Sequence, residues 1–210
     1  MNSKQQLIDY WQKDKIITDK NLLKAFAIVD REKFILPEYL EEAYDDNPLP
    51  ILGGQTISQP TTVMMMIQAL ELKKKDKILE IGAGSGYNAA IMSKLCKKIY
   101  SVEIVEELAD FARKNLKNAG IKNVEVISGD GSLGYEKFAP YDKCMITAAC
   151  PEIPETIIAQ MKINGIILAP VGVTGAGYQE LIKAKKTRKG LESESLGEFS
   201  FVPMKGKYGF

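Results

Sequence analysis

Histidine is absent from this chain of 210 residues, and cysteine and arginine each occur only three times. Without an imidazole, catalysis by a Ser-His-Asp triad or a Cys-His pair is excluded, and the commonest side-chain ligand of transition metals is missing. We therefore expect no metal site. The cysteines, Cys96, Cys144 and Cys150, match neither a zinc motif nor a redox pair, which predicts free thiols in a reducing cytoplasm.

Strong net charge and long apolar runs are also lacking. The 28 basic and 27 acidic residues leave a formal charge of +1, so no overall field attracts nucleic acid or an anionic membrane. The first residues, MNSKQQLIDYWQKDK, contain no apolar core of a secretory signal, and no apolar run reaches membrane-spanning length. We expect a soluble, cytoplasmic monomer with no nucleic-acid or membrane partner.

The length predicts one domain, which changes character along the chain. Ser3 and Asp19 precede apolar positions at helical spacing, and the pattern indicates two capped helices. With PEYLEEAY they form an N-terminal helical layer. We divide residues 1–210 into this layer at 1–47, a polar, turn-rich loop at 48–60, a core at 61–177 and C-terminal strands at 178–210.

The core shows an alternation of strand-like and helical patterns from residue 77 onward. Short β-branched runs such as KILEI, IYSVEI and GIILAPV alternate with helical patterns around 87–96, 105–118 and 154–162. This alternation predicts βαβ units, and hence an α/β fold with a mostly parallel, doubly wound sheet. YQELIKAKKT and EFSFVPM are strand-like without an intervening helix, which predicts an antiparallel C-terminal edge.

The segment ILEIGAGSGY, residues 78–87, predicts a nucleotide site. Gly82, Gly84 and Gly86 follow a predicted strand and turn the chain into a helix, where backbone can approach a ligand closely. A dinucleotide fingerprint needs a further glycine where this chain has Tyr87. The G-x-G-x-G spacing is instead typical of S-adenosylmethionine-dependent methyltransferases.

Two further loops are expected at the same edge of the sheet. Glu103 ends the second strand, where an acidic residue is expected to bind ribose hydroxyls. Asp130 and Gly131 follow the third strand, and the carboxylate there can accept from an adenine amino group or simply cap a turn. Three converging loops favour an adenosine ligand over a tight turn that binds nothing.

Several specific blocks occur along nearly the whole chain: VDREKF, YDDNPLPI, GGQTISQP, LEIGAGSGY, GDG, APYD, TAACPEIPE, NGIILAPVG, QEL and FVP. With these blocks the chain resembles the protein-L-isoaspartate O-methyltransferases. GQTIS is the most diagnostic segment because ordinary methyltransferases lack it. The resemblance implies a Rossmann-like S-adenosylmethionine-dependent methyltransferase fold, with 48–60 as substrate and donor loop and 61–177 as donor-binding core.

The resemblance implies protein repair. The family methylates the free carboxylate of L-isoaspartyl residues in damaged proteins and peptides, and S-adenosylhomocysteine is the other product; activity on D-aspartyl residues is left open. Its QTIS segment lies over the methyl donor, and its serine, here Ser58, faces the acceptor carboxylate as the catalytic residue. The donor site implied here is Gln55, Thr56, Ile57, Ser58, Glu80, Gly82, Gly84, Ser85, Gly86, Glu103, Asp130 and Gly131.

The missing histidine is consistent with this chemistry. A carboxylate is already ionised at neutral pH, and a sulfonium is a strong electrophile with a neutral leaving group. No general base is needed, so the main requirement is to align the attacking oxygen with the methyl group.

The chain departs from the family pattern in several places. Leu52 stands where members usually have a glycine, and Thr61, Thr62 and Val63 occupy the region where some members carry a histidine, whose role does not transfer. GVTGAGYQ is glycine-rich near the expected peptide groove, which suggests an unusual peptide preference.

Other functions are compatible with the same fold. One is methyl transfer to RNA or a small acid; an RNA enzyme would predict a basic stripe with stacking aromatics, which the sequence does not clearly show. Another is a catalytically silent binding subunit, which the retained glycines and Ser58 argue against. Ser58 has its own structural alternative as the cap of a helix at 61–70.

Overall fold

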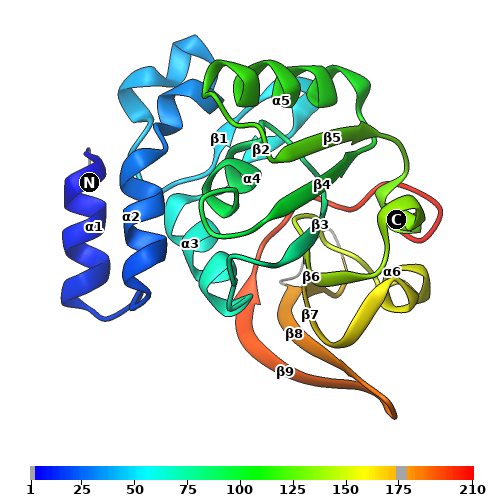
Figure 1. Ribbon diagram of the computed structural model, residues 1–210. Helices are drawn as coiled ribbons and strands as arrows, with labels where there is room; N and C mark the ends of the chain where they lie inside the picture. The colour runs from blue at the N-terminus through cyan, green and yellow to red at the C-terminus, as the bar shows by residue number, and fades with distance from the viewer. Residues whose placement is uncertain (1–2, 174–178) are drawn as a thin grey trace.

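The central feature of the fold is a seven-stranded sheet in the order β5-β4-β3-β6-β7-β8-β9 (Figure 1). The computed structural model describes residues 3–173 and 179–210. Neighbouring strands from β5 to β7 are parallel, whereas β8 pairs antiparallel with both β7 and β9. The sheet strands are β3 Lys77–Ile81, β4 Lys98–Glu103, β5 Val124–Ser128, β6 Tyr141–Ile146, β7 Met161–Val171, β8 Gln179–Thr187 and β9 Gly190–Phe199.

Alternate residues of each central strand face two separate cores, as a doubly wound sheet requires. Ile78 of β3 packs in the core shared with α1 to α4, whereas Leu79 and Ile81 pack with Ile157 of α6 on the opposite face. The predicted α/β fold with an antiparallel C-terminal edge is confirmed. The α-helices are α1 Lys4–Lys13, α2 Lys20–Ile28, α3 Pro60–Ala69, α4 Tyr87–Met92, α5 Glu106–Asn118 and α6 Glu155–Ala159.

The N-terminal layer begins where the capping residues predict. Ser3 Oγ accepts from the Gln6 N–H at 3.3 Å, and Asp19 Oδ1 accepts from the N–H groups of Asn21 and Leu22. α1 and α2 then pack through Trp11, whose ring meets Phe26 edge-on at 4.7 Å. Among the described residues, no helix is long and apolar enough to cross a membrane.

Several expected boundaries were wrong. The helices expected at 87–96 and 154–162 are shorter. The helical structure expected around PEYLEEAY is present as a 3₁₀ helix. In the hairpin, β9 ends at Phe199, so most of EFSFVPM lies outside the sheet. Pro203 lacks a backbone donor, and the chain around it bonds Ala149 instead. The 3₁₀ helices are η1 Arg31–Phe34, η2 Pro37–Glu42, η3 Leu52–Gly54, η4 Gly131–Leu133 and η5 Glu136–Phe138.

The FVP tail and the polar loop both lie at the C-terminal edge of the parallel strands. The tail, red in Figure 1, returns across this edge because Ala149 N–H donates to Val202 O and Met204 N–H donates to Ala149 O. The loop contains a short antiparallel pair, β1 Leu49–Pro50 and β2 Thr56–Ile57. Within GVTGAGYQ, residues 174–178 lie outside the described part of the chain.

Candidate active site

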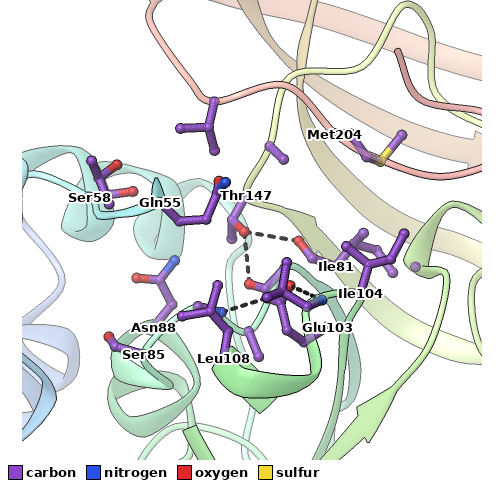
Figure 2. A pocket seen from close by; sticks show the side chains of 18 of the residues that line it. Gln55, Ser58, Ile81, Ser85, Asn88, Glu103, Ile104, Leu108, Thr147 and Met204 are labelled. Atoms are coloured by element: carbon purple, nitrogen blue, oxygen red, sulfur yellow. Dashed lines mark hydrogen bonds between the residues drawn. The ribbon is translucent and has the colours of Figure 1, made fainter. Parts of the chain in front are cut away.

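A pocket opens at the C-terminal ends of β3, β4 and β6 (Figure 2). It encloses about 800 Å³ of empty space, part of it open to solvent. This is the edge at which open α/β sheets bind their ligands. Its walls come from segments 55–58, 81–85, 102–105, 147–148 and 202–205, together with four single residues, Tyr87, Asn88, Leu108 and Gly131.

The glycine turn forms the floor of the pocket. Gly82 has a φ of +91°, and an added Cβ there would lie 2.3 Å from Thr147 Oγ1. The Thr147 hydroxyl donates to the carbonyl of Gly82 at 2.8 Å, which ties the turn to the end of β6. The N–H groups of Gly82, Gly84 and Gly86 already donate to protein acceptors. These glycines therefore shape the turn and allow close approach, and they are not themselves free donors.

Glu103 lies in the wall with its carboxylate held in place. Its side chain accepts from the N–H groups of Gly84 at 2.9 Å and Val105 at 3.0 Å, one on each oxygen. Each carboxylate oxygen has two acceptor positions, so one on each remains for a ligand. Beside it, Ile104 and Leu108 present apolar surface to the same cavity (Figure 2). A fixed double acceptor next to apolar surface suits a ribose diol attached to a flat base.

Ser58 stands on the opposite wall, at the end of the polar loop (Figure 2). Gln55, Thr56 and Ile57 line the pocket beside it. Ile57 pairs with Leu49 in the short strand pair, and its side chain is buried in the main core. Within the described residues, the Ser58 hydroxyl makes no hydrogen bond. The polar loop and the glycine turn thus face each other across one cavity.

Comparison with known proteins identifies this arrangement. The sequence matches the protein-L-isoaspartate(D-aspartate) O-methyltransferase (PCMT) family over residues 2–209. The chain belongs to this family. A protein-L-isoaspartate O-methyltransferase of Methanosarcina mazei is 51% identical over 199 residues, which are 92% of this chain and 80% of that protein. One of Dictyoglomus thermophilum is 44% identical over 198 residues, or 94% and 89% of the two chains.

Solved structures agree with this assignment. A protein-L-isoaspartate O-methyltransferase superposes with a TM-score of 0.90 and 30% identity, over 99% of this chain and 67% of that one. A Plasmodium falciparum protein in complex with S-adenosyl-L-homocysteine has a TM-score of 0.83, over 98% of this chain and 99% of that one. Its identity of 24% supports the methyltransferase fold alone.

In this methyltransferase, three of the predicted donor residues do not line the pocket. Gly86 caps α4 and packs against α5, where an added Cβ would meet Leu116 at 3.2 Å. Asp130 caps η4: its carboxylate accepts from the Ser132 N–H and hydroxyl, and also from the Lys207 N–H at 2.8 Å. The geometry thus favours the alternative in which Asp130 caps a turn. The adjacent Gly131 lies in the pocket wall.

Glu80, the third of these residues, is fully buried and does not line the pocket. It stands between Ser101 and Met145 on the neighbouring strands and accepts a hydrogen bond from the Ser101 hydroxyl. Burial raises the pKa of its carboxyl from 4.5 to about 8, against the effect of that hydrogen bond and with a small contribution from Glu103. Glu80 is therefore protonated at neutral pH.

We expect Glu80→Gln to flatten the dependence of stability on pH. The folded state keeps the Glu80 proton up to about pH 8, whereas an unfolded carboxyl with a pKa of 4.5 loses it earlier. The contribution of Glu80 to the free energy of unfolding is fully present below the pKa of the unfolded state. It is lost as pH rises toward the pKa of the folded state, by at most about 1.4 kcal/mol per pH unit. Glutamine mimics the protonated acid and removes this slope. Urea unfolding between pH 5 and 8 measures it.

The matched control is Glu107→Gln, which makes the same change on the exposed surface of α5. In this control, the free energy of unfolding should depend on pH as it does in the unmodified protein. If Glu80→Gln left the slope unchanged as well, Glu80 would be ionised in the folded state, and its burial would have to be compensated by another group.

The sequence did not single out several residues of the pocket wall. Thr147 follows β6, Asn88 stands in the first turn of α4, and residues 202–205 come from the C-terminal tail. The blocks TAACPEIPE and FVP contain Thr147 and the first two tail residues, so family resemblance marked these positions without a role. Asn88 had no such signal. Figure 2 shows its amide on the side of the cavity where Ser58 stands.

Proposed function

We infer that this protein is a repair methyltransferase, which transfers a methyl group from S-adenosylmethionine to the free carboxylate of L-isoaspartyl residues in damaged proteins and peptides. S-adenosylhomocysteine is the second product. The observation that carries this function is a single cavity with the diagnostic GQTIS loop on one wall and the glycine turn with Glu103 on the other. Family membership supplies the substrate class.

We propose a division of the pocket between donor and acceptor. Glu103 would accept from the ribose hydroxyls, and Ile104 and Leu108 would cover the adenine. The glycine turn would lie against the remainder of the donor, because it presents backbone without side chains. Asp130 contributes indirectly here, through the turn that carries Gly131.

On the acceptor side, we propose that Ser58 orients the substrate. The bound donor supplies a methyl group on a sulfonium centre. The Ser58 hydroxyl would donate to one oxygen of the isoaspartyl carboxylate, which is ionised at neutral pH, and the other oxygen would then face the methyl group. Gln55, Thr56 and Ile57 would lie over the donor, as the family resemblance implies, and would help to exclude water. Orientation of this kind needs no titrating side chain in the chain itself.

The alternative acceptors have less support. RNA recognition needs basic side chains and exposed rings, but the described pocket residues include one basic residue, Lys205, and one aromatic residue, Tyr87, which is 1% exposed. We also propose a cytoplasmic monomer without nucleic-acid or membrane partners. The near-neutral charge and the free, buried thiols of Cys96, Cys144 and Cys150 support it.

A methyl-transfer assay on two peptides tests the function. The peptides should share one sequence and differ only in an isoaspartyl or a normal aspartyl residue. We expect base-labile methyl ester on the isoaspartyl peptide and background on its twin, because only one of them presents the displaced carboxylate. A third peptide with D-aspartate tests whether the acceptor range extends further. Equal methylation of the first two peptides, or none of either, would refute the proposed function.

A further inference from the structure

The helix that follows Ser58 begins without a side-chain cap of its own. α3 starts at Pro60, and its N-cap residue, Gln59, makes no capping hydrogen bond. Pro60 has no N–H to satisfy, so Thr61 carries the first backbone donor of the helix. Free donors at a helix start need a partner. Ser58 is not that partner, which removes the structural alternative considered for it.

Asp46 supplies the missing cap from fifteen residues earlier. The Thr61 N–H donates to Asp46 Oδ1 at 2.9 Å, and the Thr61 hydroxyl donates to Asp46 Oδ2 at 2.6 Å. A charged acceptor makes both bonds strong, and a carboxylate at a helix N-terminus also suits the helix dipole. One side chain therefore holds Thr61 at two points.

The contact continues into the N-terminal layer. Trp11 Nε1 donates to Thr61 Oγ1 at 2.7 Å, and Trp11 itself is fully buried against Phe26. Thr61 is thus held from two sides. It is hydrogen-bonded to the carboxylate of Asp46 and to the indole N–H of Trp11, whose ring is packed within the N-terminal helices. Figure 1 shows α3 beside these helices. The start of α3 has little freedom to move.

Asp46 and Thr61 also close a loop that contains Ser58. Residues 46–61 leave and return at this pair of residues, and β1 and β2 pair within the loop. Ser58 lies three residues before Thr61, and its own hydroxyl has no protein partner among the described residues to hold it. Its position therefore depends on the buried neighbour Ile57, which pairs within the loop, and on the Asp46–Thr61 bonds that close the loop. We propose that Asp46 is a positioning residue, which places Ser58 against the acceptor carboxylate; this rests on the proposed function.

Asp46→Ala tests the proposal, and Asp19→Ala is its matched control. Both aspartates accept two hydrogen bonds near the start of a helix, but Asp19 caps α2, which contributes no residue to the pocket. Loss of either cap should lower the melting temperature. The fall should be larger in Asp46→Ala, because the Asp46 carboxylate also interacts with the buried guanidinium of Arg31. Well below melting, we expect kcat for the isoaspartyl peptide to fall roughly tenfold to a hundredfold in Asp46→Ala, because a displacement of about 1 Å has that effect. Asp19→Ala should keep kcat.

Two further measurements separate positioning from a general loss of structure. The affinity for S-adenosylhomocysteine should stay within a few fold in Asp46→Ala, since Glu103, Ile104 and Leu108, to which we assign the ribose and the adenine, lie outside the 46–61 loop. Asp46→Asn keeps one oxygen for the Thr61 N–H and should recover part of kcat. Equal kcat in Asp46→Ala and Asp19→Ala would show that Asp46 only stabilises the fold, and an equal fall in donor affinity would also overturn the proposal.

Hydrogen exchange tests whether Asp46 holds the 46–61 loop in place, and it needs no activity assay. Amides in segment 55–61 should exchange faster in Asp46→Ala than in Asp19→Ala, and emission from Trp11, the single tryptophan, should change only in the former. Unchanged exchange and emission would refute the closure itself. If the unmodified protein failed to methylate the isoaspartyl peptide while these signals changed as expected, the proposed function would fail and the role of Asp46 in holding the loop would stand.

Discussion

Replacing Ser58 by alanine should lower methyl transfer to an isoaspartyl peptide by roughly a hundredfold, while donor affinity stays within a few fold. The reason is geometric, because loss of the hydroxyl lets the attacking oxygen move by about 1 Å, and such a shift can cost that much in rate. The substrate carboxylate stays ionised either way, so the pH dependence of turnover should not change. Turnover, donor affinity and melting temperature should be measured on the same variant.

Ser3→Ala is the matched control for Ser58→Ala. Ser3 is a true helix cap, whose Oγ accepts from the Gln6 N–H, so its loss should cost about 1 kcal/mol of stability with little effect on turnover in the cold. Ser58→Ala should show the opposite pattern, because the α3 cap is Asp46. Near-normal turnover in Ser58→Ala would refute the orienting role. An equal loss of donor affinity would assign Ser58 to the donor side.

The second large effect is expected from Glu103→Ala, which should weaken donor binding by about 1.5–3 kcal/mol, or roughly tenfold to 150-fold. The ribose hydroxyls of the donor would lose the carboxylate that accepts their hydrogen bonds. The N–H groups of Gly84 and Val105 would also lose their acceptor, so the glycine turn should loosen and the melting temperature should fall. Calorimetry with S-adenosylhomocysteine measures the first effect, and the Michaelis constant for peptide should change less.

The control for Glu103→Ala is Glu107→Ala, which removes the same charge from the exposed surface of α5. The affinity of Glu107→Ala for S-adenosylhomocysteine should match that of the unmodified protein. If Glu103→Ala lowered the melting temperature without weakening donor binding, Glu103 would serve only the two backbone donors. The ribose site would then have to lie elsewhere in the pocket.

The sequence predicted that Gly82 and Glu103 lie close together, and the structure places both in the wall of one pocket. Gly82 follows one predicted parallel strand and Glu103 ends the next, and the C-terminal ends of such strands meet at one edge of a sheet. Their convergence could therefore be inferred from the strand pattern alone. The same argument included Asp130, and the family resemblance added Glu80; the structure places both outside the wall. Motif membership does not say which way a side chain points.

The tail and the loop closure were not predicted. EFSFVPM has the composition of a strand, yet the segment around Pro203 leaves the sheet, because Ala149 bonds its backbone from more than fifty residues away. Likewise, Ser58 before Pro60 looks like a helix cap, whereas Asp46 takes that role. Local propensity cannot identify a partner that a distant segment supplies.

By itself, the sequence determined the α/β class, the glycine turn and the antiparallel edge of this protein. These features depend on periodicity and short-range sterics, which a few neighbouring residues settle. Only the tertiary structure decided which polar groups face the cavity, because each buried donor and acceptor takes whichever partner the folded chain brings within hydrogen-bonding distance. For Glu80, Asp130 and Ser58, those partners, or the lack of one, depend on strand register and on contacts between distant segments.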